Sequence, residues 1–139
     1  MVRCFMSLAI LVGLSTVPAF ADNLSGQFLA QTVQTSKPHR DALSALVRGK
    51  QGVPPWVLNM VNKSDYVGLA SVQMPVDGKP MQLFYACEAK RCNQSAIRVL
   101  FSAGGKHVVM RINDDRLGEK FLGTPSEAER AALDRNPGT

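Results

Sequence analysis

Residues 81–101 read MQLFYACEAKRCNQSAIRVLF and decide the fold. Apolar side chains recur with a period of two at both ends of the stretch, over 81–86 and 97–101. This alternation is typical of β-strands, because successive side chains point to opposite faces of a sheet. Between the two segments, Cys87 and Cys92 bracket four residues, three of them charged. The stretch therefore predicts two strands joined by a short presented loop.

The same period continues on both sides of this stretch. Residues 67–76 are β-prone and lead into Asp77-Gly78, a strong signal for a two-residue hairpin turn. After a turn at 103–106, apolar residues alternate again over 108–112, and residues 120–122 are expected to form a short last strand. Consecutive strands with such short connections predict an antiparallel sheet of about five strands.

Two helices are expected to flank this sheet. Ser36 has the character of an N-cap, and the amphipathic segment after it ends at Gly49. Near the end of the chain, Thr124 is expected to be the N-cap of a second helix, with Pro125 in the first position and Glu127 completing a capping box. Helices before and after an antiparallel sheet define the α+β class.

The first 21 residues have the form of a secretory signal peptide. Arg3 is the only charge before an apolar run that ends in Pro-Ala-Phe-Ala at 18–21, a cleavage site with small residues. Residues 22–139 are then a single mature α+β domain, in which residues 22–36 are expected to hold a frayed helix. Loss of Arg3 lowers the formal net charge from +5 to +4, a mild excess without the Lys/Arg clusters of nucleic-acid-binding proteins. We expect an exported, periplasmic protein of a Gram-negative bacterium, with no membrane association after cleavage.

Cleavage also removes Cys4 and leaves two of the three cysteines. The spacing of Cys87 and Cys92 does not fit a Cys-x-x-Cys redox motif, and no further ligands at matching spacing support a zinc site. In an oxidising compartment the two are expected to form a disulfide. A ring this small adds only about 2 kcal/mol to stability on the chain-entropy argument. Its larger effect would be to fix one protruding conformation before binding, although a disulfide that merely tightens the hairpin end is the simpler alternative.

The remaining candidate residues favour structure over catalysis. Trp56, the only tryptophan, follows Pro54-Pro55 and is expected to be a structural anchor in the core, with a carbohydrate-stacking surface as the alternative. His39 is expected to be exposed in the first turn of its helix, and His107 to lie on the solvent side of a strand or in a hydrogen bond. No nucleophile or metal ligand accompanies either histidine in the sequence, so we expect no enzyme, cofactor or metal site.

Several of these segments resemble one known family. The similarity is to the inhibitor of vertebrate lysozyme (Ivy) family, and it extends over roughly residues 43–112. The matching segments, which come in the same order, are Val-Pro-Pro-Trp-Val at 53–57, Ala-Cys at 86–87, the four-residue bridge and the strand at 97–101. Its members are exported bacterial proteins with a helix-flanked antiparallel sheet. The resemblance implies the same scaffold for this chain.

In the best-known members of that family the loop reads Cys-Lys-Pro-His-Asp-Cys. A disulfide holds it, and it enters the active-site cleft of animal-type lysozyme, where the histidine engages two catalytic carboxylates. The resemblance places Lys90 at the histidine, Ala89 at the proline, Arg91 at the aspartate and Glu88 at the lysine. A lysine in place of the imidazole substitutes a flexible point charge for a planar ring.

The sequence therefore indicates an exported inhibitor of a peptidoglycan-cleaving glycosidase, either c-type lysozyme or a lytic transglycosylase. The inhibitory loop would be residues 88–91, with Lys90 and Arg91 attracted to the catalytic carboxylates. The alternative is a periplasmic envelope-binding protein of the same fold that no longer inhibits lysozyme. A homodimer stays open.

Overall fold

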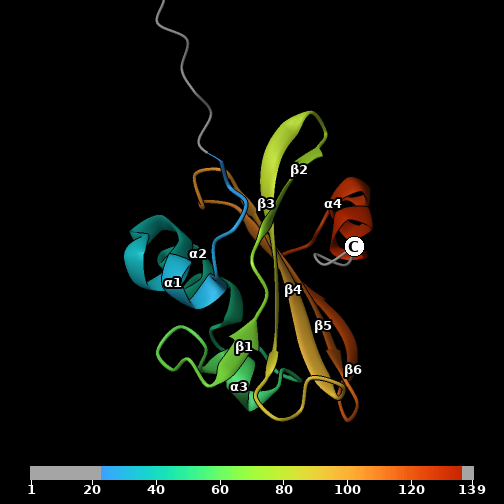
Figure 1. Ribbon diagram of the computed structural model, residues 1–139. Coiled ribbons are helices and arrows are strands. Elements are labelled where there is room, and N and C mark those ends of the chain that lie inside the picture. Colours follow the sequence, from blue (N-terminus) through green and yellow to red (C-terminus); the bar gives the residue numbers. More distant parts are fainter. Residues whose placement is uncertain (1–22, 136–139) are drawn as a thin grey trace, which may run out of the picture.

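The computed structural model describes residues 23–135, so the predicted signal peptide at residues 1–21 lies outside the described part (Figure 1). A six-stranded antiparallel sheet forms the middle layer. Helices α1 (Leu29–Thr35), α2 (Lys37–Val47) and α3 (Pro55–Leu58) lie on one side of it, and α4 (Glu127–Leu133) lies on the other. The predicted α+β class, an antiparallel sheet flanked by helices, is confirmed. Within residues 23–135, no helix has both the length and the apolar character that a membrane span requires.

The sheet is built around its longest strand. Its strands are β1 (Tyr66–Gly68), β2 (Val72–Val76), β3 (Lys79–Glu88), β4 (Ser95–Ser102), β5 (Val108–Asp114) and β6 (Gly118–Leu122). The order is β1-β3-β4-β5-β6, and β2 also pairs with β3, beyond the end of β1. Asp77 and Gly78 form the predicted hairpin turn, with φ angles of +50° and +74°.

The sixth strand arises because the predicted strand at 67–76 is interrupted at residues 69–71. The backbone of Ser71 pairs with the segment before α1 and not with β3. Its N–H donates to the Gln27 carbonyl at 2.7 Å, and its carbonyl accepts from the Gly26 N–H at 2.8 Å. A contact between segments more than forty residues apart thus divides one expected strand into β1 and β2.

The segment before α2 is well integrated into the fold. Helix α1 buries Leu29 and Val33 in the core, so the helix expected at 22–36 is packed along its length. Gln82, a fully buried residue of β3, donates through Nε2 to the Leu24 carbonyl at 2.8 Å. A buried amide needs such partners, and this bond fixes the start of the described chain against the sheet.

Each face of the sheet carries its own hydrophobic core, as the two-residue period requires. The larger core lies under α1–α3 and includes Phe84, Ile97, Val99, Phe101, Met110 and Ile112. The smaller core lies under α4 and includes Met81, Leu83, Leu100, Val109 and Leu133. Both sets of alternating residues on β3 and β4 are therefore buried, which explains why these strands are apolar throughout.

The start of α4 differs from the prediction. Ser126, not Thr124, is the N-cap: its Oγ accepts from the Glu129 N–H, and the Glu129 side chain accepts from the Ser126 N–H. Ser126 has the extended backbone that an N-cap requires. Thr124 lies in a left-handed conformation, with φ of +48°, and precedes the helix by three residues. The sequence contains two overlapping Ser/Thr-x-x-Glu patterns, and the second forms the capping box.

Candidate functional site

The loop between β3 and β4 closes one end of the sheet, next to α3 and β1 (Figure 1). Cys87 and Cys92 form the expected disulfide, with their Cα atoms 4.9 Å apart. Cys87 is only 2% exposed and is paired on both sides, with Val67 of β1 and Ala96 of β4. The ring therefore begins inside the sheet, and the central strand supports it.

Arg91 is held within the protein. Its guanidinium donates to the Glu88 carboxylate at 2.6 Å and to the Asp115 carboxylate at 3.1 Å. A third bond, from Nε, reaches the Gln94 side chain at 3.0 Å. Two acids thus compensate the charge of Arg91, whose side chain is 28% exposed. The contact with Asp115 also ties the loop to the turn between β5 and β6, so Arg91 acts as a brace for the loop.

Lys90 is in a different situation from Arg91. It is exposed, and its ammonium forms no ion pair within residues 23–135. The Arg91 N–H donates to the Glu88 carbonyl at 2.9 Å, which closes a β-turn with Ala89 and Lys90 at its centre. Lys90 takes the third position of this turn with φ of +65°, a left-handed conformation that is unfavourable for most side chains. The turn therefore presents Lys90 at its tip in a fixed orientation.

A chain of hydrogen bonds anchors the loop where it enters β4. The indole of Trp56, which is 9% exposed, donates through Nε1 to the Ser95 hydroxyl at 2.8 Å. Ser95 is buried and in turn hydrogen-bonds the carboxylate of Asp114, its partner in the β4–β5 register. The chain connects α3, the first residue of β4 and the last residue of β5, close in sequence to Cys92.

The Asp114 carboxylate also organises the β5–β6 turn. It accepts the backbone N–H groups of Arg116 and Leu117, both at 2.9 Å. Partial burial alone would raise the pKa of Asp114, but the hydrogen bonds from Ser95 and from these two N–H groups hold it below its usual value. Asp114 is therefore ionised at neutral pH and keeps the turn that carries Asp115 in place.

Two hollows flank the loop. One has a volume of about 380 Å³ and is lined by Pro55, Trp56, Asn59, Lys63, Asp65, Glu88 and Ala89. The other has a volume of about 320 Å³ and lies between the loop and the β5–β6 turn. The loop is thus a ridge between two depressions, a shape suited to insertion into a cleft.

The two histidines lie away from this loop. His39 was expected to be exposed, and this expectation was wrong: it is 8% exposed and packs on the ring of Phe101 at 4.8 Å. Its Nδ1 hydrogen-bonds the Ser36 hydroxyl at 2.6 Å. Burial lowers the pKa of His39, and the neighbouring Gln82 side chain offsets only part of this effect. His107 lies at the opposite end of the sheet, where it pairs with Glu129.

The fold and the site define an α+β protein that presents a short, disulfide-held loop with one unpaired cation at its tip. In the described part of the chain, no group of three or more His, Cys, Asp or Glu residues is arranged to hold a metal ion. No protein-family model matches the chain, and no curated protein matches it.

Proposed function

We propose that the protein is an exported inhibitor of a peptidoglycan-cleaving glycosidase, either a c-type lysozyme or a lytic transglycosylase. The observation that carries the proposal is Lys90, an unpaired cation at the tip of the loop. The disulfide, the Arg91–Asp115 ion pair and the Trp56–Ser95 hydrogen bond hold this loop in place. An inhibitor of this kind needs no cofactor and catalyses no reaction. The disulfide supports an oxidising compartment, and we place the protein in the periplasm.

The chemistry of the target suits a lysine. Glycosidases such as c-type lysozyme use two carboxyl groups, roughly 5–10 Å apart depending on the mechanism. The Lys90 ammonium has three N–H donors on a flexible stem. It can approach both carboxyl oxygens at the closer separations and displace the water or sugar oxygen that lies between them. Substrate would then have to compete with this cation for both oxygens.

Glu88 does not oppose this interaction. A lone carboxylate beside the tip would be repelled by the carboxylates of the target. Glu88 is instead paired with Arg91 at 2.6 Å, so its charge is partly compensated within the loop. The attraction to an acidic cleft is then concentrated on Lys90.

Rigidity is the second contribution of the scaffold. Ordering a flexible loop on binding reduces affinity, and a preorganised loop avoids that loss. Here the disulfide, the Arg91–Asp115 pair and the Trp56–Ser95 bond fix the loop before any partner arrives.

The test is turnover of cell-wall substrate by c-type lysozyme and by a lytic transglycosylase in the presence of mature protein. Lys90→Ala should weaken inhibition at least about thirtyfold, because it removes the charge that meets the carboxylates. Lys106→Ala removes an equally exposed lysine at the other end of the sheet and should leave inhibition unchanged. Equal inhibition by the two variants would contradict the role of Lys90.

Two more variants separate charge from rigidity. Replacing both Cys87 and Cys92 by serine should weaken binding well beyond its effect on stability. Lys90→His restores the imidazole of the Ivy loop. Inhibition only by this variant would show an intact scaffold whose natural target lies elsewhere. If neither the unmodified protein nor Lys90→His inhibits or binds either enzyme, the envelope-binding function replaces the proposed one.

A further inference from the structure

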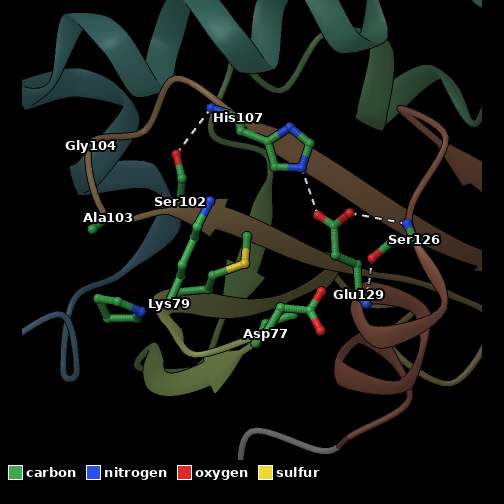
Figure 2. A pocket seen from close by; sticks show the side chains of 11 residues that line it. Asp77, Lys79, Ser102, Ala103, Gly104, His107, Ser126 and Glu129 are labelled. Carbon is green, nitrogen blue, oxygen red and sulfur yellow. Dashed lines mark hydrogen bonds and ion pairs between the residues drawn. The ribbon is translucent and has the colours of Figure 1, made fainter.

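A hollow lies beside the β2–β3 hairpin, at the opposite end of β3 from the Cys87–Cys92 loop (Figure 1), and Figure 2 shows its lining from close by. Its volume of about 600 Å³ falls in the range of small-molecule sites. The β2–β3 hairpin, the β4–β5 turn and the start of α4 enclose it. The lining side chains with the strongest bearing on a ligand are Val76, Asp77, Lys79, Met81, His107 and Glu129.

One wall of this hollow is a completed hydrogen-bond system. The Glu129 carboxylate binds His107 Nε2 at 2.6 Å through one oxygen and accepts the Ser126 N–H at 3.0 Å through the other. Both oxygens are therefore occupied. Burial alone would raise the pKa of Glu129, but the hydrogen bonds from Ser126 and the interaction with His107 bring it below its usual value. This wall is held in place, and both oxygens of its carboxylate already have hydrogen-bond partners.

The hairpin carries two charges that are not paired. Asp77 and Lys79 form no ion pair or hydrogen bond through their side chains within residues 23–135. In Figure 2 the two side chains diverge: the Lys79 amine extends toward Ser102, and the Asp77 carboxylate extends toward the start of α4. One free cation and one free anion thus stand on different sides of the same hollow.

The base of the hollow is apolar. Val76 and Met81, each 6% exposed, belong to the smaller core and also line the hollow. A methionine is well suited to this position, because its unbranched side chain adapts to ligands of different shape.

We propose that this hollow binds a small zwitterion with an apolar body, such as a short peptide with free ends and aliphatic side chains. Its carboxylate would pair with Lys79, its ammonium with Asp77, and its apolar side chains would lie on Val76 and Met81. A simple anion or a simple cation would leave one of the two charges without a partner, and an uncharged apolar ligand would leave both. This site is independent of the proposed inhibitory loop.

The experiment is an NMR titration of the mature protein with leucyl-leucine, following the backbone amides. Shifts should appear in the hairpin and in the β4–β5 turn, with saturation in the millimolar range, because both charges are exposed and their ion pairs are weak. N-acetyl-leucyl-leucine lacks the ammonium, and leucyl-leucine amide lacks the carboxylate. Each should bind about fivefold more weakly than the free dipeptide.

Variants test the same assignment from the protein side. Asp77→Asn removes the charge, and asparagine accepts the left-handed backbone of this turn. It should weaken leucyl-leucine about fivefold but leave the affinity for the acetylated dipeptide unchanged. Lys79→Gln should weaken leucyl-leucine similarly and leave the affinity for the amide unchanged. Lys106→Gln, a lysine that lies in the β4–β5 turn but does not line the hollow, is the control.

Three results would overturn the proposal. The first is an absence of shifts at the hairpin and the turn. The second is equal binding of the free and the capped dipeptides, which would show an apolar site without charge recognition. The third is an effect of Asp77→Asn and Lys79→Gln no larger than that of Lys106→Gln.

Discussion

Ser95→Ala is the substitution that most directly tests how the loop is anchored. The variant removes one hydroxyl that serves two partners, the Trp56 indole and the Asp114 carboxylate. A buried indole N–H without a partner costs about 1–3 kcal/mol, and loss of a hydrogen bond to a charged group costs about 1.5 kcal/mol or more. We expect the free energy of unfolding to fall by about 3 kcal/mol, or the melting temperature by about 10 °C.

The assay is thermal and urea unfolding followed by fluorescence. Trp56 is the only tryptophan, so its emission reports the environment of the lost bond directly. Ser102→Ala is a matched control on the same strand: its hydroxyl accepts one bond, from the His107 N–H at 3.1 Å, in an exposed setting. A loss below about 0.5 kcal/mol for Ser95→Ala, or a loss equal to that of Ser102→Ala, would refute the anchoring role.

The pH dependence separates the two parts of this effect. The pKa of Asp114 in the folded protein lies below the usual 3.8. The stability that this carboxylate contributes is therefore present above about pH 3.8 and is lost as the pH falls through the folded pKa. Ser95→Ala lowers the free energy of unfolding through both Asp114 and the Trp56 indole. The part that arises from Asp114 should become smaller in acid, whereas the part that arises from the indole should stay the same.

Three further predictions concern the rest of the fold. His39 is buried with a lowered pKa, so the unfolded chain binds its proton more readily, and the free energy of unfolding should fall as the pH drops from above 7 to about 5.5. Urea titrations at the two pH values check this, and His107→Gln should retain the dependence. Gly105→Ala should destabilise the protein by more than about 2 kcal/mol in thermal unfolding, because the new Cβ overlaps the His39 ring and φ is +78°; Gly104→Ala, with open space around it, should be nearly neutral. Ser126→Ala should cost about 1 kcal/mol, measured in the same way, and no loss would contradict its assignment as the N-cap of α4.

Local patterns in the sequence were sufficient for the α+β class and for most of the strands. The apolar segments 81–86, 97–101 and 108–112 correspond to β3, β4 and β5, and their alternate residues are buried on opposite faces of the sheet. The break at 69–71 was not predictable in this way. It depends on the pairing of Ser71 with Gln27, and no local pattern indicates a partner so far along the chain.

In the site, too, local features were predictable from the sequence, and contacts between distant residues were not. The disulfide follows from compartment and spacing, but the supports of the loop come from Trp56 of α3, from Ser95 at the start of β4 and from the end of β5, which are distant from one another in sequence. Ser95 and Asp114 were not among the predicted site residues, since nothing in the sequence indicates that they share a register. The burial of His39 was not predicted, for a different reason. Positions 39, 43, 46 and 47 lie on one face of the helix, which indicates burial, but the position of His39 in the first turn favoured exposure.

The left-handed conformation of Lys90 has a consequence for how this protein changes over time. A glycine, asparagine or histidine fits such a turn with little strain, whereas a valine or isoleucine does not. The groups that hold the ring, namely Arg91, Ser95 and Trp56, do not contact the tip side chain. A substitution at position 90 can therefore exchange an ammonium for an imidazole or an amide while the groups that hold the ring stay unchanged, so the chemistry of the loop tip can vary independently of its support.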